Sequence, residues 1–295
     1  MPLVQMGNIY YFIYIIIAIL LTILAVTFLK NKSQTFRKWF IFGLIMVGFS
    51  IHFLKIFIWP YTTVDAILTK VSFENICAVS TLVFPFLYFT KNKTLKDYMV
   101  MVGMASGIIT FIFPVDAMSE YFNGEIIGLR SAFNLEVMRF YFAHFLLFLS
   151  PFLMMRYQMH ELSIHRAYRA PIMLILVLVL IFVNELVMTL LNWVPKEDLY
   201  DPTKRNPSFI FGVRGDLTGL GLFLGIFVPF FMRIHPLTGA SFYWPVIWLI
   251  IPAIVYGGMM VLIFMFVYDT QETKLFFSKI LGVRPKEESE VEIHK

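Results

Sequence analysis

The sequence predicts an all-α membrane protein, a polytopic bundle of transmembrane helices. First, 59% of the 295 residues are hydrophobic and only 15% are charged, a composition typical of membrane proteins and not of soluble domains. Second, apolar runs of about 20 residues recur along the chain, and each is long enough to cross a bilayer as a helix. Third, the basic residues are scattered in the short loops between these runs. The net charge of +5 therefore indicates membrane orientation, and we expect no nucleic-acid partner.

Seven of the runs are predicted to cross the membrane. They occupy residues 9–29, 39–59, 72–90, 98–117, 135–155, 171–194 and 243–268. An eighth apolar segment, 217–232, is short and contains three glycines and a proline, so by itself it is compatible with crossing, re-entering or lying flat. Because the loop charges require an odd number of crossings, we predict seven spans and a non-crossing eighth segment.

Loop charges also predict the orientation. Basic residues follow the first, third, fifth and last runs: Lys30, Lys32, Arg37, Lys38, Lys91, Lys93, Lys96, Arg156, Arg166, Arg169, Lys274, Lys279 and Arg284. The positive-inside rule places these loops in the cytoplasm, and loops 60–71 and 118–134, which hold few basic residues, outside with the N-terminus. The expected location is the plasma membrane, with a cytoplasmic C-terminus.

The two ends of the chain differ in character. The first run lacks the basic flank and small-residue cleavage site of a signal peptide, so we predict a retained helix. Residues 1–270 are expected to form a single transmembrane domain. Residues 271–295 are expected to form a cytoplasmic tail that begins as an amphipathic helix and becomes acidic.

Polar or ionisable side chains occur at similar depth on several of the predicted helices: His52, Glu74, Cys77, His144, Asn184 and Glu185. Such groups are costly in hydrocarbon, so a shared layer of them suggests a functional site. A helical rise of 1.5 Å per residue places His52, Cys77, His144 and Glu185 roughly 8 to 14 Å below the outer boundary.

Cys77 is the only cysteine, so it cannot form an intramolecular disulfide. Glu74 lies three residues earlier and is predicted to share its helix face, with Lys55 and Arg139 as candidate cationic partners. The thiol is either an inert core side chain or a nucleophile whose proton a histidine such as His144 accepts.

His52 is either a satisfied contact between helices or a functional group, and Lys55 on the same face is expected to extend to the membrane surface. Asn184 and Glu185 are adjacent and point about 100° apart, so they cannot both face one narrow cavity. No two candidate ligands have the close spacing of a zinc site, and we predict neither a metal nor a cofactor.

Several ordered fragments resemble a known family. They are FSIHF at 49–53, ENICAVSTLVFPFLYFTKNKTLKDYMVMVGMASGIITFIFP at 74–114, FAHFLLFLSP at 142–151, NPSFIF at 206–211 and YWPVIW at 243–248. On these fragments the chain resembles the YwaF-type bacterial integral membrane proteins, a seven-span family related to the animal transmembrane protein 164 acyltransferases. Before the cysteine, residues 71–74 read Val-Ser-Phe-Glu where the family reads Leu-Pro-Leu-His.

The resemblance implies an acyltransferase-like protein that moves a fatty acyl group between membrane phospholipids through a cysteine thioester. Cys77 would then be the nucleophile and His144 the base. The supporting polar cavity would contain His52, Glu74, Asn184, Glu185 and Arg139. Two other interpretations of the polar layer stay open: a transporter or carrier with a buried polar cavity, and a non-catalytic membrane subunit that docks another protein through 217–232 or the tail.

Overall fold

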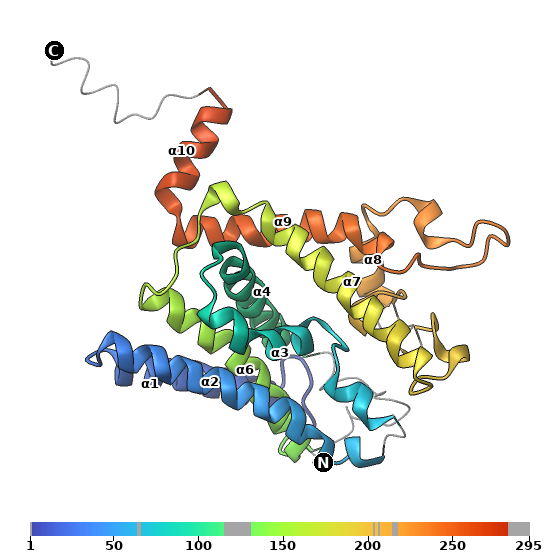
Figure 1. The fold of residues 1–295 in the computed structure, drawn as a ribbon, viewed down its shortest axis with the longest axis horizontal. Helices are drawn as coiled ribbons and strands as arrows, with labels where there is room; N and C mark the ends of the chain where they lie inside the picture. Colours follow the sequence, from blue (N-terminus) through green and yellow to red (C-terminus); the bar gives the residue numbers. More distant parts are fainter. Residues whose placement is uncertain are drawn as a thin grey trace.

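The computed structural model describes residues 2–63, 66–114, 131–202, 204–205, 207–213 and 218–282. Within these ranges the chain forms helices joined by loops, with no β-strand beyond an isolated bridge between Ile234 and Ser241. The prediction of an all-α fold is therefore confirmed (Figure 1). Part of the predicted outer loop 118–134 and the acidic part of the tail lie outside the described residues.

Six of the described helices belong to segments that are long and apolar enough to cross a membrane. They are α1 (Ile9–Leu29), α2 (Gln34–Leu54), α4 (Lys93–Ile112), α6 (Leu135–Arg156), α7 (Arg169–Leu190) and α9 (Ile247–Tyr268). Helix α3 (Ile76–Phe89) has 14 residues and rises only about 21 Å. The count of seven crossings and their orientation therefore stay predictions, which require α3 to span in a shortened form.

The eighth apolar segment contains α8 (Thr218–Gly225), a helix of eight residues. It rises about 12 Å, much less than the thickness of a hydrocarbon core. The last described helix is α10 (Thr270–Ile280), which begins directly after α9 and runs crosswise to it (Figure 1).

Capping side chains decide where several helices begin. The side chains of Asn8, Ser33, Asn75, Asn92 and Asn134 each accept a hydrogen bond from a backbone N–H in the first turn. As a result, α2 and α4 begin at Gln34 and Lys93, each five residues before the start predicted from hydropathy. Asn75 caps α3, so Glu74 precedes the helix, and the prediction that it shares a helix face with Cys77 is wrong.

Close packing of α4 on α6 sets the position of His144. A Cβ atom added at Gly107 of α4 would lie 2.6 Å from the Cβ of Phe148 and 2.8 Å from the carbonyl oxygen of His144. Only glycine permits this approach, which is the kind of small-residue contact that membrane helices use. Helices α2, α3, α4 and α6 pack as one bundle, and α7 packs with α9 beside it.

Candidate functional site

Cys77 is the second residue of α3 and is half-buried against the main hydrophobic core. One turn further along the helix, the Ser80 hydroxyl lies 3.0 Å from the Tyr98 hydroxyl of α4. The start of α3 is also fixed by the loop after α7, because the Ile76 N–H donates to Ser208 Oγ at 2.9 Å. The thiol therefore lies in the first turn of a helix whose N-terminus is held in place by a hydrogen bond to another loop.

The two ring nitrogens of His144 on α6 differ in their hydrogen bonding. Nδ1 lies 2.8 Å from the Phe140 carbonyl oxygen, one turn earlier in the same helix. Because a carbonyl oxygen accepts, Nδ1 carries the hydrogen in the neutral ring, and the Nε2 lone pair is the position that can accept a proton. Nε2 is therefore the ring nitrogen at which His144 could act as a general base.

A small cavity of about 10 Å³ lies between α2, α3 and α6, large enough for about one water molecule. Gly48 of α2, Thr81 of α3 and Ala143 of α6 are among its lining residues. His52 is four residues beyond Gly48, and Cys77 is four residues before Thr81. Residues four apart lie on one helix face, so the faces that carry His52 and Cys77 are the faces that line this cavity.

His52, near the C-terminus of α2, and Cys77, near the N-terminus of α3, lie at the same end of the bundle. Helix α2 ends next to the start of α3, as the contact between Lys55 Nζ and Glu74 Oε1 at 2.7 Å demonstrates. His52 and Cys77 are therefore each about one turn outward from the cavity, toward the same end. We call it the Cys77 end of the bundle. His144 follows the cavity-lining Ala143 and points about 100° away from it around α6.

His52 is only 7% exposed, and its Nε2 atom has no hydrogen-bond partner among the residues that the structure describes. Leaving a buried polar atom unsatisfied costs about 1–3 kcal/mol. The His52 ring also interacts with the backbone of Val71, so both interpretations of His52 stay open.

Glu74 joins α2 to the segment that precedes α3. It accepts from Lys55 Nζ at 2.7 Å and lies 3.6 Å from Lys70 Nζ. Burial alone would raise the pKa of the Glu74 carboxyl, but the two lysine charges and the hydrogen bond from Lys55 outweigh it and lower the pKa to about 2. Lys55 is 4% exposed, so the expectation that it extends to the membrane surface is wrong.

Arg139 forms its salt bridge with Glu136, to which Nε and one terminal nitrogen donate at 2.6 Å each. Of the two candidate partners for Glu74, Lys55 is therefore the one that bonds to it. Tyr61 connects the two groups: its hydroxyl donates to Glu136 at 2.9 Å, and its ring lies 5.4 Å from Lys55 Nζ and 5.5 Å from the Arg139 guanidinium.

Asn184 and Glu185 of α7 point to different partners. Asn184 Nδ2 donates to Ser72 Oγ at 3.0 Å, and the fully buried Glu185 accepts two bonds from Arg205, at 2.7 and 2.8 Å. The predicted divergence of these neighbours holds in the structure. Arg205, in the loop after α7, was not singled out from the sequence, because an arginine in a polar loop carries no local signal of a buried partner.

A second charged group lies at the opposite end of the bundle, which we call the Asp97 end. Asp97 of α4 is 2% exposed and accepts from His160 Nε2 at 2.7 Å and from Arg166 Nε at 2.9 Å. The hydropathy-based span began at residue 98 and so left Asp97 out. The cap at Asn92 is the signal that would have brought it into the helix and marked it as an ionisable residue there.

Comparison with known proteins gives a single finding. A family model described as the TMEM164 family matches residues 4–205, which include α1 to α7 and every site residue discussed above up to Arg205. No curated protein matches the chain, and no solved structure does. Helices α8, α9 and α10 lie beyond the matched segment.

Proposed function

The chain belongs to the TMEM164 family and has six helices able to cross a membrane, and from this premise we propose that it transfers a fatty acyl group between membrane phospholipids through a thioester on Cys77. The observation that carries the proposal is the tautomer of His144. Because Nδ1 is bonded to the Phe140 carbonyl, Nε2 is the nitrogen that can accept the thiol proton. Cys77 lies on the face of α3 that lines the cavity between α2, α3 and α6.

The proposed reaction has two balanced steps. In the first, His144 Nε2 takes the proton of the Cys77 thiol, and the thiolate attacks an ester carbonyl of a donor phospholipid. The ester C–O bond breaks, the acyl group stays on sulfur, and His144 returns its proton to the lysophospholipid oxygen. In the second, His144 takes the proton of an acceptor lysophospholipid hydroxyl, which attacks the thioester, and Cys77 leaves as a thiol after regaining a proton.

Two further groups support this chemistry by position. His52 has a buried Nε2 that can donate to the oxyanion of the tetrahedral intermediate when it carries a hydrogen. The ion pair between Lys55 and Glu74 holds the end of α2 against the segment before Cys77, so we assign Glu74 a positioning role. Membrane phospholipids are the proposed partners and the plasma membrane is the proposed location.

The carrier alternative depends on the same polar layer. Both of its carboxylates are ion-paired, Glu74 with Lys55 and Lys70, and Glu185 with Arg205. A transported cation would have to displace a lysine or an arginine to bind either one. This argument favours acyl transfer.

The experiment is acyl exchange in vesicles that contain the purified full-length chain, a phospholipid with a labelled acyl chain and a lysophospholipid. Cys77→Ala is expected to abolish transfer of the label. A matched control, Cys77→Ala combined with Val83→Cys, keeps one thiol on the same helix and should also be inactive. Transfer at the parental rate in Cys77→Ala would refute the assignment of the nucleophile.

A further inference from the structure

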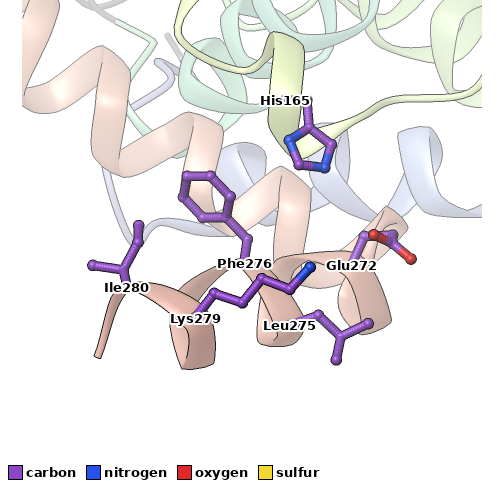
Figure 2. Close-up of a pocket in the computed structure, with 6 residues that line it drawn as sticks. All are labelled: His165, Glu272, Leu275, Phe276, Lys279 and Ile280. Atoms are coloured by element: carbon purple, nitrogen blue, oxygen red, sulfur yellow. The ribbon is translucent and has the colours of Figure 1, made fainter. Parts of the chain in front are cut away.

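A groove of about 280 Å³ lies at the Asp97 end of the molecule, remote from Cys77. It is formed between the short 3-10 helix η4 (Ile164–Arg166) and α10. Its lining consists of His165, Glu272, Leu275, Phe276, Lys279 and Ile280 (Figure 2). Five of these residues lie on α10, beyond the segment that the TMEM164 family matches.

The groove is held in place by contacts between its two walls. Asp269, at the start of α10, accepts a hydrogen bond from the Ile164 N–H at 2.9 Å. The His165 ring meets the Phe276 ring edge to face, with centroids 5.8 Å apart. Thr273 of α10 is fully buried. These contacts fix α10 against η4, so the groove is a built feature of the fold.

In the orientation predicted from the loop charges, the groove lies at the level of the lipid headgroups. Helix α9 ends at Tyr268, and α10 begins at Thr270 and runs crosswise to it (Figure 1). An amphipathic helix that turns across the end of a membrane-spanning helix lies along the bilayer surface. Phospholipid headgroups are the most concentrated solutes at that level.

The lining has two kinds of polar group around an apolar floor. Leu275, Phe276 and the largely exposed Ile280 supply apolar lining, against which a glycerol and the first acyl carbons can pack. The Lys279 ammonium and the His165 imidazole supply donors for phosphate oxygens. The Glu272 carboxylate supplies an acceptor for an ammonium. Figure 2 shows these three polar side chains around the same hollow.

We propose that this groove binds the headgroup of a phospholipid that carries both a phosphate and a primary ammonium, taken from the leaflet on which α10 lies. Lys279 and His165 hold the phosphate, and Glu272 holds the ammonium. A volume near 280 Å³ lies just below the usual range for ligand sites, and it suits a headgroup with its glycerol. The site requires neither Cys77 nor acyl transfer.

The test is native mass spectrometry of the purified full-length chain, delipidated and then titrated with phosphatidylethanolamine, phosphatidylcholine or phosphatidylglycerol of one acyl composition. The parent is expected to retain phosphatidylethanolamine best. Lys279→Gln should lower retention of all three lipids by about threefold, the size of effect expected for one exposed charge contact. Glu272→Gln should lower retention of phosphatidylethanolamine alone and so remove the preference.

Lys274→Gln is the matched control, because Lys274 is exposed on the same helix and does not line the groove. It should leave retention unchanged. Equal losses in Lys274→Gln and Lys279→Gln would mean general attraction of lipid to a basic surface and would overturn the proposal. An unchanged lipid preference in Glu272→Gln would overturn it as well. Thermal unfolding of each variant separates a lost site from a lost fold.

Discussion

The two ends of the bundle both bury charge, but they use their histidines differently. At the Asp97 end, His160 is bonded to Asp97, and Arg166 bonds to the same carboxylate. At the Cys77 end, within the part of the chain that the structure describes, His52 Nε2 has no hydrogen-bond partner and His144 is bonded through Nδ1 to its own helix. An imidazole bonded to a carboxylate that an arginine also binds stabilises a loop, whereas an imidazole with an unused nitrogen is available for proton transfer.

The largest expected effect on stability comes from Asp97→Asn. It replaces a buried carboxylate with a neutral amide, so that Arg166 loses its ion pair and keeps only its bond to the Glu161 carbonyl among the described residues, which should lower the free energy of unfolding by roughly 3–5 kcal/mol. Thermal unfolding in detergent measures it. Glu197→Gln, at an exposed glutamate, is the control and should change stability by less than about 0.5 kcal/mol. An Asp97→Asn protein as stable as the control would contradict a structural role for this end.

The next effect concerns the pH dependence at the Cys77 end. The pKa of Glu74 is about 2 in the folded chain against an ordinary 4.5, so its stabilisation is present above pH 4.5 and is lost as the pH falls from 4.5 toward 2. At neutral pH, Glu74→Gln should cost about 3 kcal/mol. Unfolding measured from pH 7 to pH 3 should show a flatter profile for the variant below pH 4.5. Parallel profiles would show that Glu74 is not held by Lys55 and Lys70.

The smallest expected change in stability comes from replacing a histidine with phenylalanine. Making this replacement at each end, at His52 and at His160, gives the sharpest contrast between the two ends. His52→Phe removes an unsatisfied nitrogen, so stability should stay within about 1 kcal/mol of the parent while acyl transfer falls at least tenfold. His160→Phe breaks a buried bond, so stability should fall by about 1–3 kcal/mol while the activity per folded molecule is kept. Equal activity in the two variants would remove the distinction between the ends.

Hydropathy predicted the helical class and the approximate position of the long helices, because lipid requires long apolar runs whatever their packing. It placed α2 and α4 five residues late because each begins with a polar turn after a capping side chain, Ser33 or Asn92. The same cause placed Glu74 inside α3, where Asn75 is in fact the cap.

The candidate site was accessible to sequence reasoning only in part. Buried ionisable residues stand out singly in apolar segments, which is how His52, His144 and Glu185 were found. Their partners were found less well, because pairing depends on how the connecting segments fold back: Lys70, in the 3-10 helix Ile67–Val71, pairs with Glu74, and Arg205, in the loop after α7, pairs with Glu185. Sequence position carries no direct information about such contacts.

The measurement that tests the central claim most directly is the intact mass of the purified chain after incubation with a donor phospholipid and no acceptor. The account predicts a mass gain equal to one fatty acyl group in place of one hydrogen, removed by hydroxylamine and located on Cys77 by peptide mapping. His144→Gln should form this adduct at least 100-fold more slowly, because the thiol loses its base. An adduct on another residue, or an unmodified Cys77 in a preparation that transfers acyl groups, would contradict the account.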